Sequence, residues 1–270
     1  ILSNVSLQVL KTDRTDAYEV RGRGELQMAV LIETMRREGY EFMVSKPKVI
    51  TREENGQKME PMEKVFLDIP EDKVGVLTEK LSARKGRMTN LQNHGFGRVS
   101  LEFSIPSRGL IGFRSQFITD TKGAGIMNKL FDGYAPWFGR IPQRNTGALI
   151  SDRQGKVTTY ACINMADRGE LFVSVGTEVY DGMVIGERNK TNDLALNITR
   201  EKKLSNMRSS GSDNTVTVRP PRELSLDQCI EFISEDELVE ITPASVRLRK
   251  MELDQQKREA AQKKERLSDQ

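Results

Sequence analysis

Apolar and polar positions follow two different periods along this chain, and its first part already shows both. Every second residue is apolar over 5–9, which predicts a half-buried strand, and a second strand is expected at 18–21. Apolar residues then recur every three or four positions over 25–38, which predicts a helix that a glycine ends. With a third strand near 42–44, these elements give a thin core. We therefore expect residues 1–57 to be an α+β domain that is truncated at its N-terminus.

The clearest alternation of the chain lies at 99–105, where Val, Leu, Phe and Ile stand at every second position. Before it come a strand pattern at 65–69, a helix pattern at 74–81 and another short strand. A further helix and a last strand complete the order β-α-β-β-α-β within 58–136. That order is the split βαβ, or ferredoxin-like, plan. We expect this domain to have it in full and the domain 1–57 to be an incomplete version of the same plan.

After residue 136 the pattern changes to short strands that Gly or Asp-Gly turns separate, which suggests a small barrel or sandwich. Ser225 and Gln228 have the spacing of a capping box, so one helix is expected to begin there. Residues 137–250 are thus predicted to form a β-rich domain with one helix. Residues 251–270 are charged and lack aromatics, which indicates a solvated helix or a disordered tail. The strands of the β-rich domain are expected at 148–151, 157–163, 171–175, 183–185 and 215–218.

The composition is that of an ordinary soluble globular protein, with 37% hydrophobic and 30% charged residues among 270. Lys and Arg number 42 against 39 Asp and Glu, so any affinity for nucleic acid must come from local patches. No apolar run reaches membrane-spanning length and the first residues do not form a signal peptide. We expect a cytoplasmic protein with no membrane partner. The sequence starts inside a strand pattern and without Met, so we also expect a piece of a longer protein.

The sequence contains no pattern that is typical of a catalytic or metal site. Cys162 and Cys229 lie far apart, and His94 is the single histidine, so we expect reduced core thiols and no zinc. The glycine clusters lack the lysine and the spacing of a phosphate-binding loop. His94 lies in a turn without a Ser, Cys or Asp partner. We predict no catalytic residue, no metal and no cofactor in this chain.

The segment 199–213 is the strongest candidate for a binding site. Arg200, Lys202, Lys203 and Arg208 stand there against one glutamate before Ser209, with no apolar period that would bury them. A basic loop between β-rich segments suits contact with a polyanion. A plain solvated loop is the alternative.

Two further basic clusters have structural alternatives. Arg84, Lys85 and Arg87 surround a glycine at a predicted helix end, where cations also favour the negative end of the helix dipole. Arg108 and Arg114 stand where the second helix of 58–136 is predicted to begin, and they could equally pair with carboxylates. Both clusters are candidates for anion contact or for structural roles.

Several motifs resemble those of one family, the translational GTPases related to elongation factor G. Gly-Arg-Gly-Glu-Leu-Gln at 22–27 and Lys-Pro-Lys-Val at 46–49 look like domain III of that family, and 58–136 looks like domain V. The motifs that resemble the BipA (TypA) branch are Ser-Arg-Gly-Leu-Ile-Gly-Phe-Arg at 107–114, Lys-Leu-Ser-Asn-Met-Arg at 203–208 and Asp-Glu-Leu-Val-Glu-Ile-Thr-Pro at 236–243. The likeness covers essentially the whole chain. One departure is Gln27, where many relatives have histidine.

The resemblance implies binding to the bacterial ribosome, chiefly its large subunit, at the site where elongation factors act. It implies roles in ribosome assembly and in stress-responsive translation linked to the alarmone ppGpp. Family members bind GTP and Mg²⁺ in domains that precede this region, so this chain alone is not expected to hydrolyse GTP. The resemblance further implies that the basic loop contacts ribosomal RNA and A-site tRNA, in a protein expected to be a monomer.

Within that expectation, the basic side chains of the loop neutralise phosphates, while Asn206 and the serines bond to sugars or bases and Met207 packs on a base. The RNA-binding residues predicted in this way are Arg200, Lys202, Lys203, Asn206, Met207, Arg208, Ser209 and Ser210. The further ribosome contacts that we predict are Arg84, Lys85, Arg87, Arg108 and Arg114. The alternative function is a protein-interaction module that docks ribosomal proteins or its own GTPase domain.

Overall fold

The chain divides into two units in the computed structural model, which describes residues 6–139, 141, 144, 146–202 and 218–268. Unit 1 consists of Ile1–Lys46 and Thr146–Gln270, and unit 2 consists of Pro47–Asn145. The sequence patterns suggested a separate domain at 1–57. In the structure, strand β3 (Phe42–Ser45) of this segment pairs antiparallel with β15 (Glu237–Ile241) of the C-terminal part. The pairing satisfies the backbone hydrogen-bonding groups at the edge of β15. It also lets a segment with little core of its own pack into a larger one.

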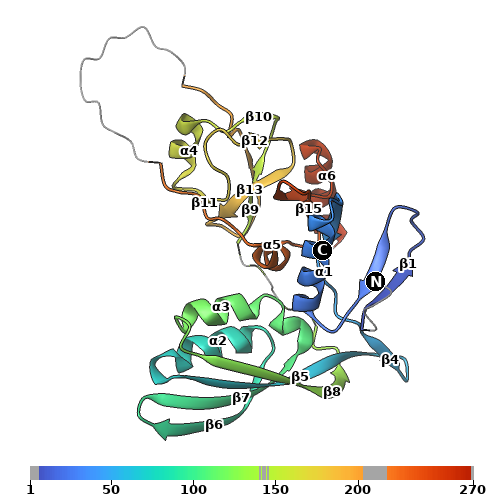
Figure 1. The fold of residues 1–270 in the computed structure, drawn as a ribbon, viewed down its shortest axis with the longest axis vertical. Coiled ribbons are helices and arrows are strands. Elements are labelled where there is room, and N and C mark those ends of the chain that lie inside the picture. The colour runs from blue at the N-terminus through green and yellow to red at the C-terminus, as the bar shows by residue number, and fades with distance from the viewer. Residues whose placement is uncertain (1–5, 140, 142–143, 145, 203–217, 269–270) are drawn as a thin grey trace. The chain divides into compact units, whose positions relative to one another are not determined.

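Unit 2 has the predicted element order β-α-β-β-α-β. Its four long strands lie antiparallel in the order β8-β5-β7-β6, which is the strand order of a split βαβ unit, and α2 and α3 lie side by side (Figure 1). A short strand, β4, pairs with the beginning of β5. The elements of unit 2 are β4 (Arg52–Glu54), β5 (Gln57–Pro70), η1 (Glu71–Lys73), α2 (Val74–Ala83), β6 (Arg87–Gly95), β7 (Arg98–Pro106), η2 (Ser107–Leu110), α3 (Phe113–Asp120) and β8 (Ile126–Pro136).

The core of unit 2 lies between the helices and one face of the sheet. Strand β7 alternates as predicted, with its apolar side chains buried and its polar side chains half-buried. Leu77 of α2 and Phe113 of α3 pack in the same cluster as Leu101 and Phe103 of β7. Burial of each such side chain contributes about 1.5–3 kcal/mol, so this cluster accounts for the alignment of helices and strands.

Arg108 joins η2 to strand β5 and to the segment that follows β8. Its guanidinium donates to the Glu60 carboxylate from Nε at 2.5 Å and from Nη2 at 3.0 Å. Glu60 is 1% exposed, Arg108 is 11% exposed, and the backbone N–H of Phe138 also donates to Glu60 at 2.7 Å. The guanidinium carbon lies 3.7 Å from the ring centroid of Trp137, and Nη2 donates to the carbonyl of Gly139. A buried pair with this many partners is structural.

Unit 1 is built on a seven-stranded sheet in the order β14-β9-β13-β16-β15-β3, with β11 paired to β13. Two further two-stranded sheets, β1 with β2 and β10 with β12, are separate from this sheet. The remaining elements of unit 1 are β1 (Gln8–Lys11), β2 (Tyr18–Arg21), α1 (Glu25–Arg37), β9 (Ala148–Ser151), β10 (Gly155–Lys156), α4 (Thr159–Met165), β11 (Gly169–Leu171), β12 (Glu178–Val179), β13 (Met183–Arg188), β14 (Leu194–Leu196), α5 (Leu226–Phe232), β16 (Val246–Lys250) and α6 (Gln255–Ser268).

The sheet of unit 1 is covered on both faces, in place of the barrel or sandwich that strand spacing suggested. Ile150 of β9 packs with Ile32 of α1 and Ile230 of α5. Its neighbour Leu149 belongs to a second cluster, with Cys162 of α4. Successive side chains of a strand point to opposite faces, so α4 and α5 lie on opposite sides of β9 and β13 (Figure 1).

The strand predicted at 157–163 is wrong, because helix α4 occupies most of this range. Thr158 caps the helix: its side chain accepts a hydrogen bond from the backbone N–H of Ala161 at 3.2 Å. The β-branched and aromatic residues here favour a strand by propensity, and the cap and the burial of Cys162 override them. Unit 1 therefore has α4 in addition to the one helix predicted for the C-terminal domain.

The predicted capping box of α5 is confirmed, and the charged tail is helical. Ser225 accepts from the backbone of Gln228, whose side chain accepts from the backbone of Ser225 at 3.0 Å. In the tail, α6 agrees with the solvated-helix alternative. Of the strand expected at 215–218, only the last residue is among those that the structure describes.

A buried ammonium joins three parts of unit 1. Nζ of Lys250, a side chain only 2% exposed, lies 2.9 Å from the carboxylate of Glu237, which is 0% exposed. Asp193 and Asp236 lie 2.6 and 2.7 Å from the same nitrogen. Burial by itself lowers the pKa of Lys250, but the charges of these three carboxylates outweigh it and hold the pKa above its ordinary value. The cluster fixes the entry to β14 against the ends of β15 and β16.

Replacing Lys250 by methionine is expected to lower the unfolding free energy of unit 1 by about 3–5 kcal/mol at neutral pH, because three carboxylates lose their counter-charge. Urea unfolding followed by circular dichroism measures this loss. Lys257→Met, at an exposed position of α6, is the matched control and should change stability by less than about 0.5 kcal/mol. Equal stability of the two variants would contradict the role of the cluster.

The raised pKa of Lys250 also gives the sign of a pH dependence. The stability that the ammonium provides is complete below the unfolded pKa of about 10.4 and is lost as pH rises through the folded value. The difference in unfolding free energy between the unaltered chain and Lys250→Met should therefore shrink above that pH. A difference that stays constant or grows would contradict the sign.

For unit 2, Arg108→Ala is expected to cost about 3–5 kcal/mol, because it leaves the Glu60 carboxylate buried without its counter-charge. Arg114→Ala, which removes an exposed arginine of α3, serves as control and should cost less than about 0.5 kcal/mol. Thermal unfolding of both variants tests whether Arg108 has a structural role or is free for contact with an anion. A variant at this position that unfolds like the unaltered chain would exclude the structural role.

Candidate nucleic-acid interface

The basic loop enters the described part of the structure only at its first residues. Arg200 and Lys202 follow the buried strand region of unit 1, and both side chains are exposed. The other residues predicted to contact RNA lie outside the described residues: Lys203, Asn206, Met207, Arg208, Ser209 and Ser210. The site can therefore be described at the root of the loop.

Hydrogen bonds and close packing hold this root in place. The hydroxyl of Thr158, the cap of α4, donates to the backbone carbonyl of Arg200 at 2.5 Å. Asn197 accepts from the backbone N–H and from the hydroxyl of Thr199, each at 3.0 Å. Gly155 passes so close that a Cβ there would lie 2.8 Å from a methyl carbon of Thr199. The backbone of Arg200 is thus fixed while its side chain remains exposed.

A small recess opens beside this root, with a volume of about 220 Å³. Arg168 and Arg200 line it together with Tyr160, Asn164 and Asn197. Two apolar side chains of α4, those of Ala161 and Met165, complete the wall. The recess joins residues that are about forty positions apart in sequence, and it is next to the loop that charge alone had indicated.

The recess is electropositive. Two arginines line it and no carboxylate does, although Asp167 and Glu201 are exposed neighbours in sequence. Within the part of the chain that the structure describes, the guanidinium groups of Arg168 and Arg200 have no hydrogen bond or ion pair. Most other cationic side chains of unit 1 that make a polar contact pair with a carboxylate, as Arg222 pairs with Glu187 at 2.8 Å. Such an unbalanced pair of arginines favours an anion.

Sequence reasoning missed Arg168, Tyr160 and Asn164 as site residues. It assigned 157–163 to a strand, which ends before Asn164 and Arg168 and therefore did not group them with Tyr160. In helix α4, Tyr160 and Asn164 are one turn apart and share a side, and Asn164 donates to the carbonyl of Tyr160 at 2.7 Å. The one local signal was Thr158, an N-cap residue type directly before the helix.

The basic residues predicted in unit 2 do not share one environment. Arg84 donates from Nη1 to the carbonyls of Gly109 and Ile111, at 2.9 and 2.8 Å. Arg108 is occupied by Glu60, as described above. Lys85, Arg87 and Arg114 are exposed. The geometry around Arg84 and Arg108 fits the structural alternative, and the other three cations are available to a partner.

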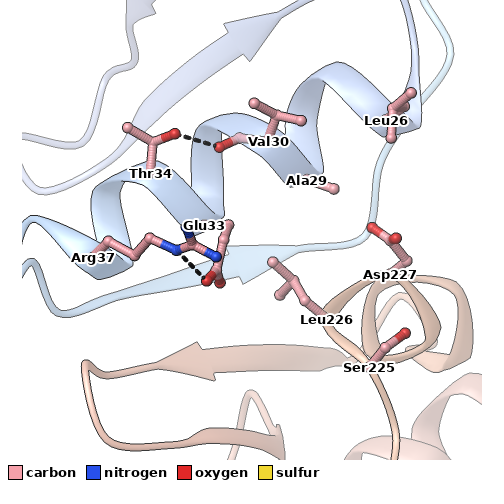
Figure 2. Close-up of a pocket in the computed structure, with 9 residues that line it drawn as sticks. All are labelled: Leu26, Ala29, Val30, Glu33, Thr34, Arg37, Ser225, Leu226 and Asp227. Atoms are coloured by element: carbon pink, nitrogen blue, oxygen red, sulfur yellow. Dashed lines mark hydrogen bonds and ion pairs between the residues drawn. The ribbon is translucent and has the colours of Figure 1, made fainter.

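A larger groove of about 420 Å³ lies between α1 and α5 in unit 1 (Figure 2). Leu26, Val30 and Leu226 contribute apolar surface to it. Its charged residues Glu33 and Arg37 pair with each other at 2.8 Å, as the dashed line in Figure 2 marks. Asp227 is the remaining charged residue of the lining, and one carboxylate beside an ion pair does not indicate a chemical role for the groove.

The candidate metal ligands and nucleophiles of the chain can be located among the described residues. No group of three or more His, Cys, Asp or Glu side chains within them could bind a metal ion. Cys162 and Cys229 are free, buried thiols, and burial raises the pKa of Cys229 to about 12. The expectation that His94 lies in a turn without a Ser partner is wrong: His94 is in β6, and its ring bonds to the hydroxyl of Ser100 on the neighbouring β7 at 2.6 Å, at an exposed position. None of the helices in the described ranges is long and apolar enough to span a membrane.

Comparison with known families matches both units. The family described as "Elongation factor G C-terminus" matches residues 57–145. The family described as "TypA/BipA C-terminal domain" matches residues 146–255. A crystal structure of a Thermus thermophilus protein shares 23% identity over 30% of this chain and 12% of its own, with a TM-score of 0.29.

Among curated proteins the chain is similar to several named "Large ribosomal subunit assembly factor BipA". The protein of Bacillus subtilis is 47% identical over 267 residues, which cover 98% of this chain and 44% of that protein. The Salmonella typhimurium protein is 49% identical over 264 residues, 97% of this chain and 43% of the relative. The Synechocystis protein is 48% identical over 249 residues, 92% of this chain and 42% of the relative.

The chain thus spans less than half the length of these relatives, and the match within that span is almost complete. The two family matches follow one another along the chain in the order that the resemblance to elongation factor G and to its BipA branch predicted. The chain therefore belongs to the TypA/BipA family of elongation factor G-like proteins.

Proposed function

We propose that this chain is the ribosome-binding region of a TypA/BipA translational GTPase that acts in assembly of the large ribosomal subunit. The observation that carries the proposal is the match of 97–98% of the chain, at 47–49% identity, to relatives named for that assembly. The electropositive root of the basic loop supports it, because ribosomal RNA is the dominant polyanion of a ribosomal subunit.

Binding rests on the loop and its root in this proposal. The lysines and arginines of 199–213 neutralise phosphates and release counterions, which gives affinity without sequence preference. Asn206 and the serines add hydrogen bonds to sugars or bases, and Met207 packs on an exposed base. Ribosomal RNA of the large subunit and A-site tRNA are the proposed partners of the loop.

GTP and Mg²⁺ are assigned in this proposal to parts of the family's proteins that this chain does not contain. The relatives extend well beyond the region that matches this chain. No glycine-rich sequence of this chain has the lysine and spacing that hold a nucleotide phosphate. The proposal further places the protein in the cytoplasm, as a monomer, in ribosome biogenesis and stress-responsive translation.

A second candidate function is docking of a ribosomal protein through unit 2. It is favoured by apolar side chains that unit 2 exposes, among them Phe96, Leu130 and Phe131. Phe96 is fully exposed in the turn between β6 and β7, where its φ of 55° is unusual for a bulky residue. An interface of this kind resists salt and does not need the basic loop.

Charge reversal of Lys202, Lys203 and Arg208 to glutamate is expected to weaken co-sedimentation of the chain with large ribosomal subunits. The slope of log affinity against log salt should also fall, by about 0.7–0.9 for each phosphate that the variant no longer neutralises. A matched triple reversal at Arg14, Arg153 and Lys257, which are exposed in unit 1, controls for net charge.

Equal weakening by both triple variants would assign the effect to net charge and exclude a loop contact. Binding that survives the loop variant and resists high salt would favour the protein-docking function. A chain that does not sediment with large subunits at all would refute the proposed function.

A further inference from the structure

We infer that the recess lined by Arg168 and Arg200 is a binding site for one nucleotide of single-stranded RNA, in which the two guanidinium groups donate hydrogen bonds to its phosphate. This inference rests on the proposed function and adds to it a defined contact outside the basic loop. Arg168, Tyr160 and Asn164 become binding residues by this assignment.

Charge indicates the first part of the ligand. The chain as a whole has 42 basic and 39 acidic residues, so two arginines in one recess without a carboxylate are a local excess of positive charge. Arg168 and Arg200 line the recess without a carboxylate and without a partner among the described residues. Guanidinium groups match the geometry of phosphate oxygens, with two N–H donors for two acceptors.

Size indicates that the recess takes part of a larger molecule. Sites that enclose a whole small ligand have volumes of about 300–1,000 Å³, and this recess has about 220 Å³. One unit of a polymer fits such a volume better than a complete cofactor does. Arg200 belongs to the recess and is also the second residue of the basic loop, so a polymer held by the loop would continue here.

The other lining groups indicate a nucleotide in preference to an acidic peptide. Tyr160, Ala161 and Met165 give the recess an aromatic ring and apolar surface, on which a base can stack. Asn197 uses its carbonyl oxygen for Thr199, which leaves its amide N–H groups without a partner among described residues. Asn164 donates one N–H to Tyr160 and keeps its carbonyl oxygen as an acceptor. Donor and acceptor together suit a base edge, whereas a carboxylate needs donors alone.

The test measures binding of the full chain to a fluorescently labelled single-stranded RNA oligonucleotide by anisotropy, and to large ribosomal subunits by sedimentation. Arg168→Ala is expected to weaken oligonucleotide binding about tenfold, the effect of one charge-assisted contact. It should also lower the salt slope by about 0.7, the value for one phosphate of a single strand. Arg153→Ala is the matched control, because Arg153 is exposed in the same unit, pairs with Asp152 and does not line the recess.

Asn164→Asp provides a second variant of nearly equal shape. It places a negative charge beside the two arginines and is expected to weaken RNA binding at least as much as Arg168→Ala does. Circular dichroism and thermal unfolding of each variant show whether the fold is kept. If Asn164→Asp binds RNA as the unaltered chain does, the recess is not a phosphate site.

Further outcomes overturn the inference while leaving the proposed function in place. In the first, Arg168→Ala leaves both ribosome sedimentation and RNA binding unchanged. In the second, Arg168→Ala and Arg153→Ala weaken RNA binding equally. The third is a mononucleotide that binds as tightly as the oligonucleotide, which would make the recess a site for free nucleotides. Competition by polyglutamate at equal charge would assign the recess to an acidic peptide and overturn it as well. Failure of the unaltered chain to bind ribosomal subunits or RNA would overturn both proposals.

Discussion

The ammonium of Lys250 is the interaction on which unit 1 depends. Three carboxylates within 2.9 Å compensate its burial, and without it they would repel one another. One of them, Asp193, also accepts a hydrogen bond from the backbone of Ala148 at 2.8 Å, so the cluster reaches β9 as well as β15 and β16. Because β9 is buried on both faces, its position determines where α4 and α5 pack. The position of α4, and with it the recess beside α4, thus depends in part on a charge cluster elsewhere in the sheet.

Arginine has opposite roles in the two units, and its neighbours decide which. Arg108 is enclosed by Glu60, Trp137 and the backbone carbonyl of Gly139, so its charge is compensated within the fold. Arg168 and Arg200 line a recess without a carboxylate, and the binding that we infer gives their charge a ligand. A buried pair contributes to structure because breaking it is costly, whereas an uncompensated pair at a surface contributes to binding. The same residue type in a basic cluster therefore does not have one function.

The parts of the fold that the sequence predicted are those with a strong local pattern. The alternation at 99–105 became β7, and the capping box at Ser225 starts α5. Helix α4 was missed because its residues favour a strand by propensity, and its helical state depends on one cap and on packing against the sheet. Because the helix was not predicted, Arg168 and Asn164 were not recognised as neighbours of Arg200, which charge alone had indicated. The charge pattern of the sequence therefore could not predict a recess whose wall depends on that helix.

The sequence by itself determined the element order of unit 2, the capping of α5, the local excess of positive charge at 199–213 and the motifs of the family. These are properties of neighbouring residues, for which spacing in the chain is sufficient. Only the tertiary structure decided that β3 joins β15, that Lys250 meets three carboxylates and that Arg168 stands with Arg200. Each of these pairs residues distant in sequence, and their meeting depends on burial and electrostatic compensation summed over a whole sheet, which no local pattern records.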